Sequence, residues 1–124
     1  MTIETIHLSE KAKNQLLTLK RKTGIQHWNI LCRWAFCASL AEPSTPPDED
    51  IPSDSSVEMA WRTFGGPHES VYMGLLRQRA EQDNFPLNND NELFYFRLHL
   101  HRGISYLSGN THIKSIATLL QTAL

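Results

Sequence analysis

Residues 26–41 read QHWNILCRWAFCASLA, and the fold depends on this stretch more than on any other. Between His27 and Leu40 only four residues are polar, and they share no single face of a helix, so apolar side chains point in nearly every direction. These polar residues are His27, Asn29, Arg33 and Ser39. The pattern predicts a helix that is buried on all sides. A chain of 124 residues is too small to surround such a helix easily, so we expect an obligate homo-oligomer with this helix near its centre.

Arg33 lies in the middle of this apolar helix. An unpaired charge inside a protein is very costly, so an interior guanidinium needs a carboxylate or carbonyl partner. The sequence therefore predicts that Arg33 is anchored.

A second helix is predicted upstream, over residues 10–22. Ser9 is the expected N-cap, and Gly24 is the expected left-handed residue that ends the helix. Residues 2–8 alternate imperfectly between apolar and polar, which makes a short N-terminal strand possible. Apolar side chains share one face of the helix, and cations occupy its rims and its far side. The apolar residues are Ala12, Leu16 and Leu19; the cations are Lys11, Lys13, Lys20, Arg21 and Lys22.

Charge is divided unevenly along the chain, although its net value is only −1. Residues 1–40 carry six Lys or Arg against two Glu, whereas residues 41–60 carry six Asp or Glu and no Lys or Arg. A basic block can bind a polyanion, and an acidic block cannot lie on the same polyanion. The basic helix is therefore the candidate surface for nucleic-acid phosphates; the alternative is an ordinary solvated helix face.

The rest of the chain predicts further helices. Residues 42–56 contain four prolines and no aromatic residue, which is typical of an exposed, poorly ordered linker. Pro67 suits the start of a helix that reaches about residue 83, after which residues 84–91 are rich in turn formers. Helices are also predicted over residues 92–107 and 113–123. The expected fold is mainly α: one compact helical domain over residues 1–124, with a possible short N-terminal strand, assembled as a helical-bundle homo-oligomer.

His99 and His101 form an HLH triplet in the helix predicted over residues 92–107. Residues two apart on a helix point about 200° apart, so the pair cannot bind one metal ion together. We expect one histidine to make a buried hydrogen bond and the other to be exposed. Gly103, in mid-helix, predicts a close approach to another helix.

No catalytic centre, metal site or cofactor is predicted. No nucleophile elbow, zinc-protease or P-loop pattern is present, and the pair Gly65-Gly66 is better explained by a turn than by a phosphate site. Cys32 and Cys37 are expected to be buried thiols in a reducing cytosol. The N-terminus does not read as a secretory signal, and no apolar run is long enough to span a membrane. The expected location is cytoplasmic.

Three segments together resemble the DndE family, the small proteins of the bacterial DNA phosphorothioation (sulfur-modification) system. They are SEKAKNQLLTLKRKTGIQHWNILCRWAFCASL (residues 9–40), WRTFGG (residues 61–66) and FRLHLHRGISYL (residues 96–107). The resemblance implies a helical homotetramer that binds double-stranded DNA and prefers nicked duplex. It also implies partners among the other DNA sulfur-modification proteins, including a cysteine desulfurase. The implied DNA contacts are lysines, which match the basic residues at positions 11–22.

Three functions follow as hypotheses. The first is a DNA-binding subunit without catalytic activity, which grips the DNA backbone through several copies of the basic helix. The second is a structure-dependent DNA nickase, an activity that has been proposed within the family. The third is an assembly scaffold whose lysines contact acidic protein surfaces.

Overall fold

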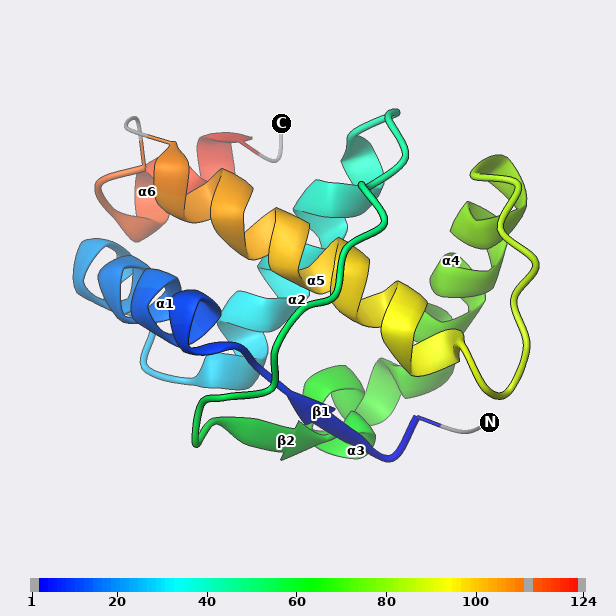
Figure 1. Ribbon diagram of the computed structural model, residues 1–124. Helices are drawn as coiled ribbons and strands as arrows, with labels where there is room; N and C mark the ends of the chain where they lie inside the picture. The colour runs from blue at the N-terminus through cyan, green and yellow to red at the C-terminus, as the bar shows by residue number, and fades with distance from the viewer. Residues whose placement is uncertain (1–2, 111–112, 123–124) are drawn as a thin grey trace.

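The computed structural model describes residues 3–110 and 113–122. Two helices, α2 (Trp28–Ala41) and α5 (Glu92–Gly109), cross at the centre of the molecule (Figure 1). Helices α1 (Glu10–Thr23) and α6 (Ile116–Thr122) lie at one end of this pair, and α4 (Glu69–Gln82) lies at the other. The prediction of a mainly helical fold with a short N-terminal strand is confirmed.

The crossing of α2 and α5 depends on Gly103. A Cβ atom at this position would lie 1.7 Å from the carbonyl oxygen of Ala35, far inside van der Waals contact. Ala35 is itself fully buried and has the smallest side chain that a good helix former offers. The two backbones therefore touch, as the mid-helix glycine predicts.

An aromatic cluster fills the core beside this crossing. Phe36 of α2 and Phe96 of α5 have ring centroids 5.1 Å apart, and Phe64 lies 5.8 Å from the first and 5.0 Å from the second. Trp61 packs edge-on against Phe96 at 5.1 Å. Trp61 and Phe64 come from α3 (Trp61–Gly65), so this short helix is attached to the core by its aromatic side chains.

The N-terminal strand pairs with a partner that the sequence pattern did not reveal. Strand β1 (Thr5–His7) runs antiparallel to β2 (Glu58–Ala60), with Ile6 opposite Met59. Both of these side chains are buried. Three residues are too few to show the alternation by which β2 could be predicted.

Several element boundaries differ from the prediction. The stretch before residue 69 forms α3 and the 3₁₀ turn Gly66–His68, where a lead-in turn and the first residues of one long helix were expected. The last helix begins at Ile116, later than predicted. The predicted end of this helix, at about residue 123, falls outside the described residues. No helix in the described part of the chain is long and apolar enough to cross a membrane.

Helix α2 is not buried on all sides within one chain. Its inward face is covered by α5 and α3, and the buried residues are Leu31, Cys32, Ala35, Phe36 and Ser39. The opposite face keeps an open apolar hollow of about 380 Å³ lined by Ile30, Arg33, Trp34, Cys37 and Tyr72. The expectation that both thiols are buried is wrong, because Cys37 is exposed at this hollow.

We predict opposite effects for two glycine-to-alanine substitutions. Gly103→Ala forces a methyl group against the Ala35 carbonyl, and the free energy of unfolding should fall by about 3 kcal/mol or more. Gly74→Ala in α4 meets no atom within 4 Å, so it should raise this free energy by about 0.5–1 kcal/mol. Urea denaturation of the two variants measures both values. Equal effects would contradict the close crossing.

Candidate nucleic-acid interface

Helix α1 has the ends that the sequence predicts. The Ser9 side chain accepts a hydrogen bond from the Ala12 backbone N–H at 3.0 Å. At the other end Gly24 adopts a left-handed conformation with φ 76°, and its N–H donates to the Lys20 carbonyl at 2.9 Å. The buried face of α1 packs on α5, which leaves the basic residues around the remaining surface.

The five predicted DNA-binding residues all lie on this surface. Lys11 and Arg21 are exposed, whereas Lys13, Lys20 and Lys22 are half-buried. By helical phase, Lys13 and Lys20 lie together on one side of α1, about 10 Å apart along its axis. Lys11 and Lys22 lie together on another side, about 16 Å apart. Four of the cations thus form two rows, and Arg21 lies on the exposed ridge of the helix between them.

Local contacts distinguish the members of these rows. Lys20 Nζ lies 3.7 Å from the centroid of the Trp28 ring, a cation–π contact that restricts this flexible side chain. Lys13 Nζ lies 3.8 Å from the Glu10 carboxylate, which offsets part of its charge. The charge pattern could not reveal that Trp28 takes part in this basic surface. Its place as the first aromatic residue after α1 is the one signal in the sequence.

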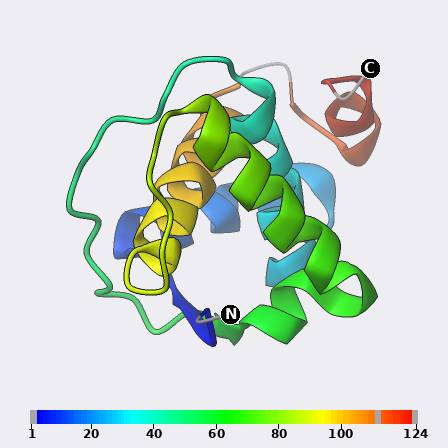
Figure 2. The ribbon, with the colours of Figure 1, turned by 90° about the vertical axis from the view of Figure 1, so that its right-hand side faces the viewer.

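The segment between α2 and β2, residues 42–57, is here called the strap. It has no regular secondary structure, in line with its proline content, and Figure 2 shows it running along the outside of the molecule. Its path is nevertheless fixed by arginines of α4 and α5. Arg97 donates to the carbonyls of Ile51 and Pro52 at 2.8 and 2.9 Å, and Arg102 donates to that of Ser44 at 2.6 Å. The expectation of a loose linker is therefore corrected.

The strap also reaches the N-terminus of α1. Asp54 Oδ1 accepts a hydrogen bond from the Glu10 backbone N–H at 2.7 Å. A carboxylate at this end of a helix is favoured by the helix dipole and by the unpaired N–H groups of the first turn. Ser55 continues the attachment, because its backbone N–H and its hydroxyl both donate to the Leu8 carbonyl.

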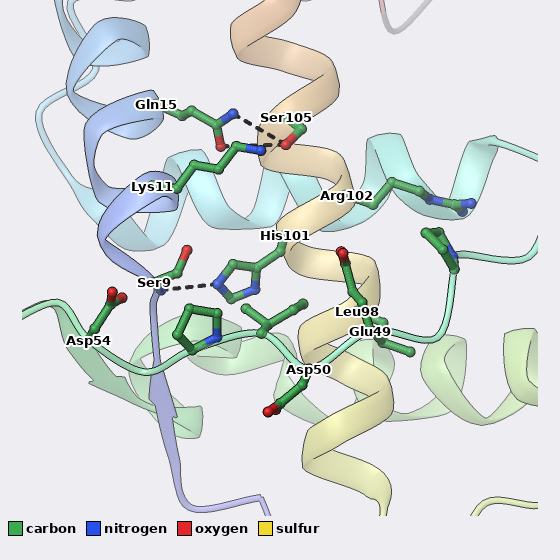
Figure 3. A pocket seen from close by; sticks show the side chains of 13 residues that line it. Ser9, Lys11, Gln15, Glu49, Asp50, Asp54, Leu98, His101, Arg102 and Ser105 are labelled. Carbon is green, nitrogen blue, oxygen red and sulfur yellow. Dashed lines mark hydrogen bonds between the residues drawn. The ribbon is translucent and has the colours of Figure 1, made fainter.

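A hollow of about 320 Å³ lies between the strap, the start of α1 and the middle of α5 (Figure 3). Its lining mixes charges of both signs. The charged residues are Lys11, Glu49, Asp50, Asp54 and Arg102. No ion pair within 4.0 Å joins Lys11 to a strap carboxylate among the described residues. The structure thus places Lys11 beside the acidic groups of the strap.

His101 forms part of the floor of this hollow and is held in its neutral form. Its Nδ1 donates to the Arg97 carbonyl at 2.9 Å, since a carbonyl can only accept, and its Nε2 accepts from the Ser9 N–H at 3.2 Å. Burial lowers the pKa of His101 to about 4. The ring therefore ties α5 to the start of α1.

His99 points to the other side of α5, toward α2 and α4. Its Nδ1 lies 2.8 Å from the Ser39 hydroxyl, and its Nε2 lies 3.2 Å from the Asp83 carboxylate. Burial lowers the pKa of His99 to about 4, although the Asp83 contact opposes this shift. Asp83 is also bound by Arg79 and the Tyr95 hydroxyl. The expectation that one of the two histidines is exposed is wrong, because both are buried.

Arg33 is anchored, as its position in an apolar helix predicts. It donates to the carbonyls of Thr63 and Phe64 at the end of α3. The neighbouring Gly66 has a φ of 59°, which a glycine adopts without strain. The Gly65-Gly66 pair therefore forms a turn, and the two carbonyls just before it, those of Thr63 and Phe64, accept from Arg33. In the described part of the chain, no three His, Cys, Asp or Glu side chains are grouped so that they could hold a metal ion.

Comparison with known proteins identifies one family. The sequence profile described as "DNA sulphur modification protein DndE" matches residues 5–115. The fold is similar to the crystal structure of DndE from Escherichia coli B7A involved in DNA phosphorothioation modification, with 24% identity and a TM-score of 0.71. It is also similar to a DndE glycine-to-lysine mutant involved in DNA phosphorothioation, with 20% identity and a TM-score of 0.67. Each match covers 86% of this chain and 98% of the other. No curated protein gives a significant match.

The neutral histidines predict a loss of stability in acid. Both have a pKa of about 4 in the fold against 6.5 when unperturbed, so the unfolded chain binds more protons between these values. The free energy of unfolding should therefore fall as the pH drops from about 6.5 to 4, by on the order of 1–3 kcal/mol for each histidine.

Denaturant titrations across this pH range measure the slope. His101→Gln should reduce the slope of the unfolding free energy against pH by the contribution of nearly one bound proton. His68→Gln, at an exposed site, is the matched control. A slope that stays unchanged in the His101 variant would contradict the neutral, buried assignment.

Proposed function

The chain belongs to the DndE family of DNA sulphur modification proteins, and from this premise we propose that it is a DNA-binding subunit of the phosphorothioation machinery. The proposed ligand is double-stranded DNA, held through its phosphates and not read at its bases. The proposed contacts are the cations of α1: Lys11, Lys13, Lys20, Arg21 and Lys22. The proposed partners are other copies of the chain and the other proteins of the DNA sulfur-modification system.

The observation that carries this proposal is a division between two kinds of cation. The guanidiniums of Arg33, Arg79, Arg97 and Arg102 donate to backbone carbonyls. The cationic groups of α1 make no such bond among the described residues, where they contact the Glu10 carboxylate, the Thr18 hydroxyl and the Trp28 ring. The α1 cations therefore remain free to bind an external anion. Lysine stems also lie along apolar surface while their ammonium groups reach solvent.

One copy of α1 offers few phosphate contacts, so we propose that the DNA-binding surface belongs to an oligomer. The apolar hollow on α2, with Ile30, Trp34 and Cys37 in its lining, is the surface on which copies are proposed to meet. A symmetric assembly repeats each basic helix, and neighbouring basic surfaces merge. The family resemblance suggests a homotetramer.

A preference for nicked duplex follows from the cost of bending DNA. A rigid surface with several basic helices requires the duplex to adapt to it, and bending a continuous site costs on the order of 1–6 kcal/mol. An interrupted strand bends more cheaply. The proposed subunit therefore favours the nicked form without contacting the ends of the broken strand.

Charge reversal on α1 distinguishes DNA binding from a scaffolding role. The triple variant Lys13→Glu, Lys20→Glu, Lys22→Glu should lose DNA binding in a gel-shift titration and keep its oligomeric mass in light scattering. Arg62→Glu, Arg77→Glu, Lys114→Glu is the matched control, because it reverses three exposed cations outside α1 and changes the net charge by the same amount. Normal DNA binding by the α1 variant would contradict the proposal and would favour the assembly-scaffold hypothesis.

A salt series on intact and nicked duplexes of one sequence tests the mode of binding. Affinity should fall steeply with salt, by about 0.9 log unit per phosphate for each log unit of salt, and nicked duplex should bind more tightly throughout. Equal affinities at every salt concentration would refute the nick preference. Conversion of supercoiled plasmid to open circle in magnesium or manganese would instead support a nickase.

A further inference from the structure

The strap carries four exposed carboxylates, and Figure 3 shows three of them, Glu49, Asp50 and Asp54, around the hollow between α5 and the start of α1. These strap carboxylates are Asp48, Glu49, Asp50 and Asp54. Three of them line the same hollow as Lys11. The arrangement brings a negatively charged segment to one end of the basic helix, which is unexpected for a surface that receives phosphates.

The strap is held there by its backbone. Arg97 and Arg102 bind its carbonyl oxygens. The side chains of Asp48, Glu49 and Asp50 are exposed to solvent. Asp50 lies close enough to Arg97 to oppose the lowering of the pKa of that guanidinium by burial. With Glu42 the strap has five carboxylates, and three guanidiniums bind it, those of Arg79, Arg97 and Arg102, so an excess of two negative charges remains.

The position of Asp54 fixes which end of α1 is affected. Its carboxylate is hydrogen-bonded to the N–H of Glu10, one residue before Lys11. Lys20 and Lys22 lie near the opposite end, about 13–16 Å further along the helix. This distance exceeds the screening length of about 8 Å in physiological salt. Repulsion from the strap therefore acts at the N-terminal end of α1 and fades toward its C-terminal end.

We propose that the strap is a specificity element that repels straight duplex DNA and thereby favours duplex that bends away from it. A straight duplex lying along α1 from Lys20 must pass over Lys11 and the strap carboxylates. A nicked duplex bends cheaply enough to keep its contacts at Lys20 and Lys22 while leaving the strap. The inference rests on the proposed DNA-binding function and adds a cause for the nick preference that the cost of bending alone does not supply.

The test is the triple variant Asp48→Asn, Glu49→Gln, Asp50→Asn, measured by fluorescence anisotropy on intact and nicked duplexes of one sequence. Asp54 is left unchanged because it caps α1. In low salt the variant should bind intact duplex roughly three- to ten-fold more tightly, and nicked duplex should gain less. The ratio of the two dissociation constants should move toward one. In high salt the difference from the unaltered protein should shrink.

The matched control is Glu69→Gln, Glu81→Gln, Asp90→Asn, which neutralises three carboxylates on α4 and the loop that follows it. It should leave the ratio unchanged. Equal gains on both duplexes in the strap variant, or no gain, would overturn the strap inference and leave DNA binding intact. If the unaltered protein binds neither duplex, the proposed function fails first, and the inference fails with it.

Discussion

The contact between Gly103 and the carbonyl oxygen of Ala35 sets the distance between α2 and α5, and the other elements are arranged around these two helices. Because the backbones touch, the larger side chains of both helices are displaced to the flanks of the crossing. Phe36 and Phe96 meet there and accept the aromatic residues of α3. A side chain at position 103 would separate the helices and open this cluster, so the packing of the core depends on the absence of a Cβ atom at this position.

The second constraint is electrostatic, and it separates the arginines of α4 and α5 that bind the strap from the cations of α1. A guanidinium is a planar fork with several donors, so one arginine can bind two or three carbonyls of a segment that lacks secondary structure. Arg79, Arg97 and Arg102 hold the strap in this way. A lysine presents a single charge on a flexible stem, which suits a contact with a mobile polyanion. The lysines of α1 are left in that condition.

The two histidines of α5 show how divergent side chains join three helices. His99 reaches Ser39 of α2 on one side, and His101 reaches Ser9 at the start of α1 on the other. Their separation of about 200° on the helix, which prevents a shared metal site, is the property that allows this. Both rings are buried, and burial lowers the pKa of each to about 4, so the two histidines join the three helices as neutral groups, and the Arg102 guanidinium adds charged hydrogen bonds to Ser39.

The sequence by itself determined the elements with strong local signals. The caps of α1, the close approach at Gly103, the anchoring of Arg33 and the set of basic residues on α1 were all predictable, because the signal for each lies within its own helix even where the partner is distant in sequence. Only the tertiary structure decided what depends on distant partners. It pairs β2 with β1, stacks Trp28 on Lys20, buries both histidines and fixes the strap beside Lys11. The strap shows the reason most clearly: its composition predicts disorder, and the arginines that order it lie about 30 to 60 residues away in sequence.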